Sequence, residues 1–197
     1  MEEPISFASG SLRLAGMLEK AADARAVVIT HPHPLYGGDM DNTVVLAVRQ
    51  AYLRKGYSTL RFNFRGTGGS EGHYDNGAGE RQDAQAAITW LAGLGMTHID
   101  LAGYSFGAWV NAGLSAGFQR MVMVSPPVAF IDFGPPAPIP RLHLIVTGDR
   151  DDIAPAHTLS TFRAQWNPAA AFEVIPGADH FYTRSLETLA NTLSAHI

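Results

Sequence analysis

The stretch His98-Ile99-Asp100-Leu101-Ala102-Gly103-Tyr104-Ser105-Phe106-Gly107 decides the fold of this chain. An apolar run ends in the pattern Gly-x-Ser-x-Gly, and a run of small residues with helical character follows. This order predicts a strand, a sharp turn and a helix, the nucleophile-elbow arrangement that presents Ser105 above the carboxyl edge of a sheet. Ser105 is then expected to hold a strained, left-handed backbone, as functional residues often do. Because short matches of this kind also arise by chance, the rest of the chain has to supply the context.

The composition indicates a globular protein of the α/β size range. The chain has 197 residues, 46% of them hydrophobic, and shows no linker or internal repeat, so we expect a single domain spanning residues 1–197. A net charge of −4 gives no basic footprint for nucleic acid, and the absence of cysteine excludes disulfides and thiolate chemistry. No apolar run approaches the ~20 residues of a spanning helix, and the start of the chain carries acidic residues where a secretory signal would be basic and apolar. We therefore expect a cytoplasmic location.

Strand-like and helix-like patterns alternate along the chain. Residues 5–20 alternate loosely around a Ser-Gly-Ser turn, which predicts a β-hairpin. Short apolar runs predict buried strands at 25–30, 58–64, 98–104, 120–125, 141–147 and 171–175. Periodic stretches predict helices at 42–56, 79–94, 157–166 and 184–197, besides the elbow helix. This alternation predicts an α/β fold with a mostly parallel twisted sheet and helices on both faces.

The loops that carry reactive side chains each follow a predicted strand directly. They contain His31, Ser105, Asp151 and His180. In a parallel sheet, ligands bind beyond the carboxyl ends of the strands, so we expect all four residues at one edge. A serine hydroxyl is a weak nucleophile at neutral pH and needs a base that is itself oriented by a third group. The chain order serine, aspartate, histidine supplies these groups.

At these residues the chain resembles the small, lidless serine hydrolases of the α/β-hydrolase superfamily. The resemblance covers nearly the whole chain and rests on residues 31–38 (HPHPLYGG), 61–72 (RFNFRGTGGSEG), 103–107 (GYSFG), 148–155 (GDRDDIAP) and 177–181 (GADHF). It implies an α/β-hydrolase fold with an N-terminal β-hairpin and no cap domain. It also implies a serine esterase or thioesterase that needs no cofactor.

Carried onto the matching positions, the resemblance implies a catalytic triad. Ser105 is the nucleophile, His180 is the base, and Asp151 is the orienting acid because it stands third after the glycine that opens its loop. Asp149 and Asp152 lie in the same loop, and the sequence leaves Asp152 open as an alternative. The implied reaction is hydrolysis of a carboxylic ester or thioester through an acyl-enzyme.

Acyl transfer also needs N–H groups aimed at the developing oxyanion. The resemblance places one donor at the backbone N–H of Phe106, directly after the nucleophile. The second is expected from the loop after the strand at 25–30, where two prolines have no N–H to offer. His33, Leu35 and Tyr36 remain, and His33 is favoured by its position. This loop departs from the His-Gly form of many relatives, so the sequence leaves the second donor open.

The connection at 126–140 is rich in proline and too short to fold as a separate cap. We therefore expect an open pocket lined by Tyr36, Phe130 and Phe133, with Leu35 and Ile131 adding apolar surface. Such a rim suits a short acyl group carried on a larger alcohol or thiol.

Other site types fit the sequence less well. His31 and His33 are spaced as zinc ligands can be, but no third-ligand pattern accompanies them, and His31 is expected to hold its loop by hydrogen bonding. Residues 66–71 lack the third glycine of a dinucleotide fingerprint. A non-catalytic binding protein on the same fold and an acyltransferase using the same triad remain alternatives. We expect a small-molecule substrate and no metal, cofactor, nucleic-acid or membrane partner. The physiological substrate and the oligomeric state stay open.

Overall fold

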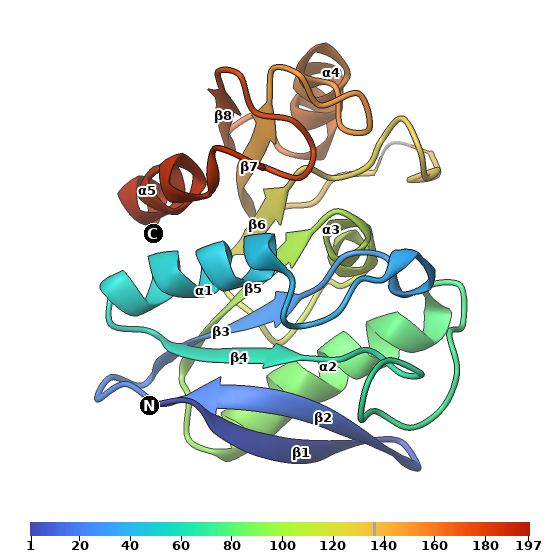
Figure 1. Ribbon diagram of the computed structural model, residues 1–197, viewed down its shortest axis with the longest axis vertical. Helices are drawn as coiled ribbons and strands as arrows, with labels where there is room; N and C mark the ends of the chain where they lie inside the picture. Colours follow the sequence, from blue (N-terminus) through green and yellow to red (C-terminus); the bar gives the residue numbers. More distant parts are fainter. Residues whose placement is uncertain (136) are drawn as a thin grey trace.

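An eight-stranded sheet runs through the computed structural model, which describes residues 1–135 and 137–197. Its strands are β1 (Glu3–Ser9), β2 (Leu12–Glu19), β3 (Arg25–Thr30), β4 (Ser58–Phe62), β5 (His98–Tyr104), β6 (Met121–Val124), β7 (Leu142–Gly148) and β8 (Ala171–Ile175). They lie in the order β1-β2-β4-β3-β5-β6-β7-β8 (Figure 1). β1 and β2 form an antiparallel hairpin, β2 is antiparallel to β4, and the remaining pairings are parallel. The mostly parallel sheet with an N-terminal hairpin is confirmed.

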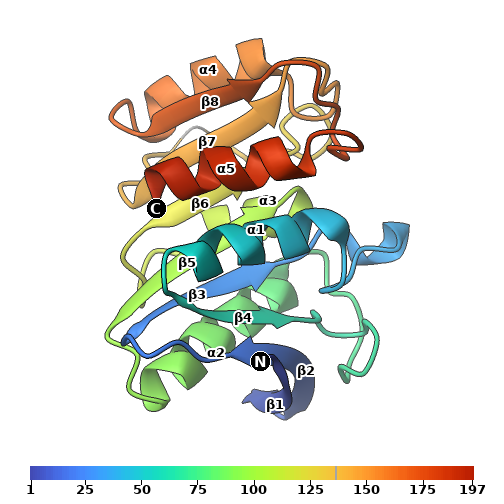
Figure 2. The ribbon, with the colours of Figure 1, turned by 60° about the vertical axis from the view of Figure 1, so that its left-hand side comes forward.

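Helices cover both faces of this sheet (Figure 2). Helices α1 (Thr43–Arg54) and α5 (Leu186–His196) pack on one face. Helices α2 (Ala78–Gly93), α3 (Phe106–Ala112) and α4 (Ala156–Trp166) pack on the other. The inner parallel strands are therefore buried on both sides, which is why they read as continuous apolar runs rather than as alternating patterns.

The strand predicted at 58–64 ends earlier, at Phe62, because the backbone N–H of Phe64 is bonded to a side chain and not to a neighbouring strand. The N–H of Asn63 still donates to the carbonyl of Ala15 (2.9 Å), but the N–H of Phe64 donates to the ring of His31 (3.0 Å). Phe64 itself stays fully buried. A side-chain acceptor from a distant loop thus replaces a strand neighbour, which a local sequence pattern does not report.

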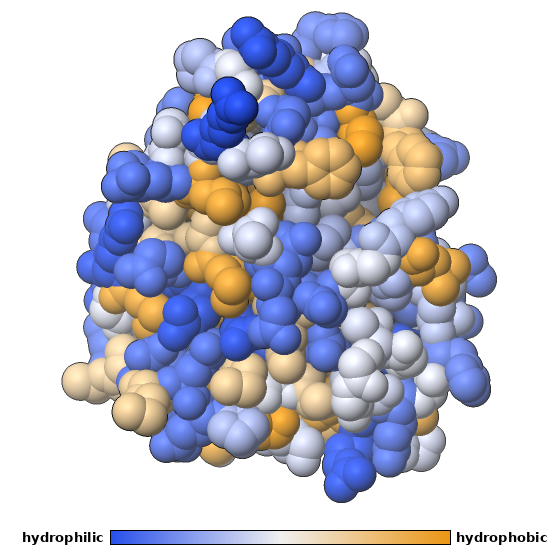
Figure 3. All heavy atoms as spheres, in the orientation of Figure 1, coloured by the Kyte–Doolittle hydropathy of each residue, from blue (hydrophilic) through white to orange (hydrophobic). Residues whose placement is uncertain are grey.

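The connection between β6 and β7 contains no helix or strand in its described residues, 125–135 and 137–141. No separate layer of structure covers the carboxyl ends of the strands there. Across the described residues, no helix combines the length and apolar character that crossing a membrane requires. On the face seen in Figure 3, apolar residues form small patches separated by hydrophilic ones.

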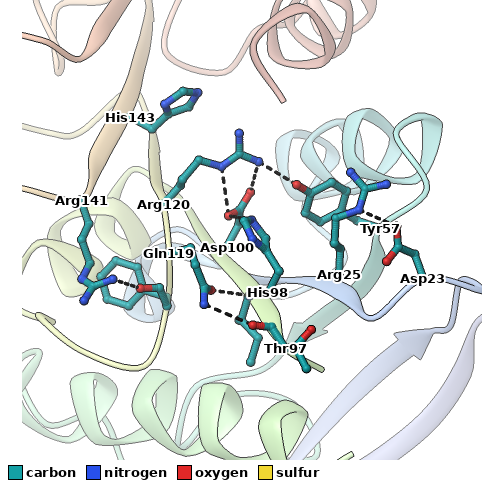
Figure 4. Close-up of polar contacts among 12 residues, drawn as sticks. Asp23, Arg25, Tyr57, Thr97, His98, Asp100, Gln119, Arg120, Arg141 and His143 are labelled. Atoms are coloured by element: carbon teal, nitrogen blue, oxygen red, sulfur yellow. Dashed lines mark hydrogen bonds and ion pairs between the residues drawn. The ribbon is translucent and has the colours of Figure 1, made fainter. Parts of the chain in front are cut away.

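The amino ends of the parallel strands are joined by a buried ion pair (Figure 4). Asp100, fully buried near the start of β5, accepts two hydrogen bonds from the guanidinium of Arg120 (2.7 and 3.2 Å) and lies 3.1 Å from the ring of His98. Arg120 also donates to the hydroxyl of Tyr57 (2.7 Å), just before β4. This network ties the starts of three strands together at the edge opposite the carboxyl ends.

Candidate active site

The carboxyl ends of β5, β7 and β8 bring three side chains from distant parts of the chain into one hydrogen-bonded row. The hydroxyl of Ser105 lies 3.0 Å from Nε2 of His180. Nδ1 of the same ring lies 2.9 and 3.0 Å from the two carboxylate oxygens of Asp151. All three residues are buried. The structure therefore joins the three residues that the sequence singled out, at hydrogen-bond distances throughout.

Ser105 sits on the sharp turn between β5 and α3, with φ 53° and ψ −119°. The glycines on either side are required by close packing. A Cβ at Gly103 would lie 2.6 Å from the backbone nitrogen of Ala108, and one at Gly107 would lie 2.5 Å from the carbonyl oxygen of Thr30. This backbone conformation is strained for a serine, and the surrounding structure holds it in place.

The environment of His180 sets its tautomer. Nδ1 faces the carboxylate of Asp151, so Nδ1 carries the ring proton and donates a hydrogen bond to that carboxylate. Nε2 is then unprotonated and accepts from the Ser105 hydroxyl. The ring is thus arranged to take a proton from Ser105 and to keep its orientation while it is charged.

Asp151 is held as a carboxylate. Burial raises its pKa, but the hydrogen bond and charge of His180 outweigh it, so the pKa lies below its usual value. The backbone N–H groups of Ile153 and Ala154 also donate to Oδ1, at 3.0 and 2.8 Å. The rival residues lie elsewhere: Asp152 is exposed, and the exposed Asp149 accepts from the N–H of Gly177 (2.6 Å). Of the three aspartates in this loop, only Asp151 hydrogen-bonds to His180.

Among the candidate oxyanion donors, two backbone N–H groups have no acceptor within the described part of the chain. One belongs to Phe106, at the first turn of α3, and the other to His33, in the loop after β3. The other candidates are engaged. The N–H of Leu35 donates to Nδ1 of His33 (3.2 Å), and that of Tyr36 donates to the carbonyl of His33 (3.1 Å). The prediction of Leu35 as an oxyanion donor is therefore wrong, because its N–H is already bonded to the ring of His33.

The ring of His33 shapes the loop that offers this N–H. It caps a short 3₁₀ helix (Pro34–Tyr36), and its Nε2 lies 3.2 Å from the hydroxyl of Tyr74. The ring also packs on Phe106, with centroids 4.6 Å apart. Burial lowers the pKa of His33, and a neutral ring is what accepting a bond at Nδ1 requires.

His31 holds the same loop from beneath, as the sequence predicted. Its Nε2 accepts the N–H of Phe64 (3.0 Å), so its Nδ1 carries the proton and donates to the carbonyl of Pro32 (2.7 Å). Burial lowers the pKa of His31 to about 4. Both ring nitrogens are used by the backbone and neither is free to ligate a metal. Within residues 1–135 and 137–197, no group of three or more histidines or carboxylates is placed to hold one.

A cavity of about 270 Å³ opens beside Ser105. Tyr36 and Phe130 line it from two loops, with ring centroids 5.9 Å apart. Phe133 does not line this cavity, because its ring packs instead against Trp166 on α4, with centroids 5.1 Å apart. That part of the sequence prediction is wrong. Leu35 is largely exposed and also lies outside the lining.

Several lining residues were missed from the sequence, among them two apolar ones on the loops that carry Asp151 and His180. Phe181 and Ile153 belong to the cavity wall, and Phe181 is 63% exposed. The available signal was their position, since Phe181 directly follows His180 and Ile153 is two residues after Asp151. No local pattern distinguishes a residue that faces a pocket from one that faces solvent.

Comparison with known proteins places this chain in a family. A sequence model of the family described as X-Pro dipeptidyl-peptidase (S15 family) matches residues 19–134, more than half of the chain. The chain belongs to this family, within the α/β-hydrolase superfamily. An uncharacterised protein from Rickettsia prowazekii is 35% identical over 200 residues, an alignment that covers 94% of this hydrolase and 84% of the relative.

Solved structures show the same fold. The hydrolase is 33% identical to an α/β serine hydrolase homologue from Coxiella burnetii, with a TM-score of 0.90 and coverage of 99% and 97% of the two chains. It is 28% identical to a serine hydrolase without a lid from Xanthomonas campestris, with a TM-score of 0.87 and coverage of 99% and 93%. These similarities confirm the α/β-hydrolase fold without a cap domain. The family match ends before Asp151 and His180, so their assignment rests on the geometry.

Three polar or aromatic side chains of this hydrolase make structural contacts away from the cavity. Arg65 pairs with the buried carboxylate of Asp83 (2.8 Å). Glu71 accepts the backbone N–H of Arg13 (2.8 Å). Trp109 donates from its indole to a carbonyl in the connection after β6 (2.9 Å). None of the three lines the cavity beside Ser105.

Proposed function

We propose that this hydrolase cleaves carboxylic esters or thioesters through an acyl-enzyme on Ser105. The observation that carries the proposal is the unbroken row of hydrogen bonds from Ser105 through His180 to Asp151. A strained serine, a base in the accepting tautomer and a charged orienting acid are the parts that nucleophilic acyl transfer requires. A purely structural role would need no such combination.

The reaction follows from these positions. Oγ of Ser105 attacks the substrate carbonyl while Nε2 of His180 takes the hydroxyl proton. The tetrahedral oxyanion accepts hydrogen bonds from the N–H groups of Phe106 and His33, each worth about 3 kcal/mol in such sites. His180 then gives its proton to the leaving alcohol or thiol, and the acyl group remains on Ser105. A water molecule, deprotonated by His180, attacks the acyl carbonyl, and the carboxylic acid leaves with Ser105 restored.

The cavity favours a short, uncharged acyl group. Its volume of about 270 Å³ is small, and its walls carry no Asp, Glu, Lys or Arg side chain. A charged acyl group would lose its hydration there without gaining a partner. Without a cap domain, the alcohol or thiol part can extend past the exposed aromatic rings at the rim. This agrees with a small-acyl substrate on a larger alcohol or thiol.

A dipeptidyl-peptidase activity is the second candidate, because the matched family carries that description. Such a substrate has a free amino terminus close to the cleaved bond. A buried ammonium needs a carboxylate partner, and none lines this cavity. The lining therefore favours the neutral ester over the amino-terminal peptide.

One experiment separates an enzyme with an activated serine from a non-catalytic binding protein. The protein is treated with a fluorophosphonate probe beside Ser105→Ala, His180→Ala and Ser115→Ala, which alters an exposed serine as a control. We expect labelling of the wild type and of Ser115→Ala, and loss of labelling in the other two. A folded wild type that is not labelled would contradict the proposal and favour a non-catalytic binding protein.

The substrate class is then tested with matched compounds. Acetyl, butyryl and octanoyl esters of one alcohol vary the length of the acyl chain, and a succinyl ester beside a butyryl ester varies its charge. We expect the short neutral esters to give the highest kcat/KM, and an Ala-Pro anilide with a free amino terminus to react poorly. Preference for octanoyl esters would overturn the small-acyl assignment. Product formed only when an alcohol or amine is added would indicate an acyltransferase.

A further inference from the structure

The peptide between Pro32 and His33 carries one of the two unbonded N–H groups that the proposed reaction uses. His33 and Phe106, the two donor residues, both line the cavity beside Ser105. In a trans peptide such as this one, the carbonyl and the N–H point in opposite directions. Nδ1 of His31 holds the carbonyl of Pro32 at 2.7 Å. The N–H of His33 is therefore directed away from His31.

The side chain of His33 holds the other end of this N–H group. Its ring packs on the ring of Phe106, with centroids 4.6 Å apart, so the side chains of the two donor residues lie against each other. Nδ1 of the same ring accepts the N–H of Leu35 (3.2 Å). The place of the His33 N–H relative to that of Phe106 thus depends on where the His33 ring lies.

The ring of His33 has a second polar contact, with Tyr74. Burial lowers the pKa of His33 and favours the neutral ring, which carries one proton. Because Nδ1 accepts a bond, that proton is on Nε2, which donates to the Tyr74 hydroxyl at 3.2 Å. The Tyr74 ring also packs against both donor residues, with centroids 5.1 Å from His33 and 5.9 Å from Phe106. Tyr74 therefore contacts the side chains of both donors.

The segment that carries Tyr74 is itself fixed. The buried carboxylate of Glu80, in α2, accepts the backbone N–H groups of Asp75 (2.9 Å) and Gly77 (2.7 Å). Gly77 has a φ of 89°, and a Cβ there would lie 2.2 Å from the ring of Trp109 in α3. The backbone directly after Tyr74 is thus bonded to one helix and packed closely against another, which gives the tyrosine a fixed support.

We propose that Tyr74, acting through the ring of His33, is a positioning residue that sets the place of the His33 N–H relative to the N–H of Phe106. The proposal rests on the proposed acyl-enzyme function, because it concerns the two donors to the oxyanion of that reaction. Tyr74 lies outside the lining of the cavity beside Ser105. Its effect is expected in the transition state, where the bonds to the oxyanion are strongest.

The first test uses Tyr74→Phe, which keeps the ring and removes the hydroxyl. We expect kcat on a short neutral ester to fall about fivefold with KM unchanged, the effect of one hydrogen bond. A trifluoromethyl ketone analogue of the same ester adds Oγ of Ser105 to its carbonyl and forms an oxyanion in the same place. Its inhibition constant should therefore rise by the same factor. Tyr57→Phe, which removes a hydroxyl bonded to Arg120 at the opposite edge of the sheet, is the matched control and keeps both values.

A double-variant comparison tests whether Tyr74 acts through the ring of His33. His33→Asn keeps a side-chain oxygen able to accept the N–H of Leu35, as asparagine does at helix starts, but removes the ring that bonds Tyr74. We expect Tyr74→Phe to slow the wild type and to have no further effect in His33→Asn. Equal losses in the two backgrounds would overturn the proposal.

Two further variants separate the ring of His33 from its N–H. His33→Ala and His33→Pro both lack the ring, and the proline also lacks the N–H. The φ of −59° at this position is close to the value that proline fixes. We expect His33→Pro to be about 100-fold slower than His33→Ala. Equal rates would overturn the donor assignment and this proposal with it.

Failure of this proposal and failure of the proposed function give different results. Unchanged kcat and an unchanged inhibition constant in Tyr74→Phe, with a wild type that reacts with the fluorophosphonate, would overturn the positioning role alone. A folded wild type that does not react with the fluorophosphonate would overturn the proposed function itself.

Discussion

The buried ring of His31 makes the stability of this protein sensitive to acid. Both of its nitrogens are committed to the backbone, Nε2 as an acceptor and Nδ1 as a donor, and this arrangement exists only for the neutral ring. Burial, with a smaller effect of the charge on nearby His33, lowers the pKa of His31 from 6.5 to about 4. The test changes the pH and compares the free energy of unfolding of the wild type with that of His31→Gln.

The sign and size of the effect follow from proton linkage. Between pH 6.5 and about 4 the unfolded chain binds a proton at residue 31 that the folded protein does not. The free energy of unfolding therefore falls as the pH falls through this range, and this contribution is intact above it. A difference of about 2.5 units, at about 1.4 kcal/mol per unit, corresponds to a loss of about 3 kcal/mol.

Urea unfolding at several pH values from about 7.5 to about 4.5 measures this loss. At neutral pH, His31→Gln is expected to be less stable than the wild type by about 1–3 kcal/mol, because one backbone partner loses its bond. On acidification its free energy of unfolding should fall less steeply, so the gap between the two proteins narrows. His157→Gln, at an exposed histidine, controls for loss of a histidine in general. Parallel curves for the wild type and His31→Gln would refute the argument.

Three further substitutions test the packing. Gly107→Ala places a Cβ 2.5 Å from a backbone oxygen of β3, so thermal denaturation should show destabilisation by about 1–3 kcal/mol and labelling of the serine should slow. Arg120→Ala leaves the buried Asp100 without its main partner, and urea unfolding should show a loss of about 3 kcal/mol, with kcat per folded molecule unchanged. Phe130→Ala should raise KM with little change in thermal stability, because Phe130 lines the cavity. Phe133→Ala should lower the thermal stability with little change in KM, because its ring packs against Trp166 and lies outside the cavity.

The parts of the fold that the sequence predicted are those encoded by local patterns. The elbow around Ser105 requires small residues at fixed offsets, and the buried parallel strands require continuous apolar runs, so both are visible over a few residues. The end of β4 was not predicted, because the N–H of Phe64 is taken by the side chain of His31 from another loop. Such long-range partners have no local signature.

The features of the site also fall into those that the sequence predicted and those that it did not. The sequence by itself determined that Ser105, His180 and an aspartate of one loop lie beyond strand ends, because a parallel sheet brings those ends to one edge. Only the tertiary structure decided that Asp151 rather than Asp152 faces His180, that His33 rather than Leu35 or Tyr36 keeps an unbonded N–H in the loop after β3, and that Ser125 meets Tyr182. Those choices depend on side-chain direction and on loop conformations set by packing between segments far apart in the chain, and the order of residues alone does not specify them.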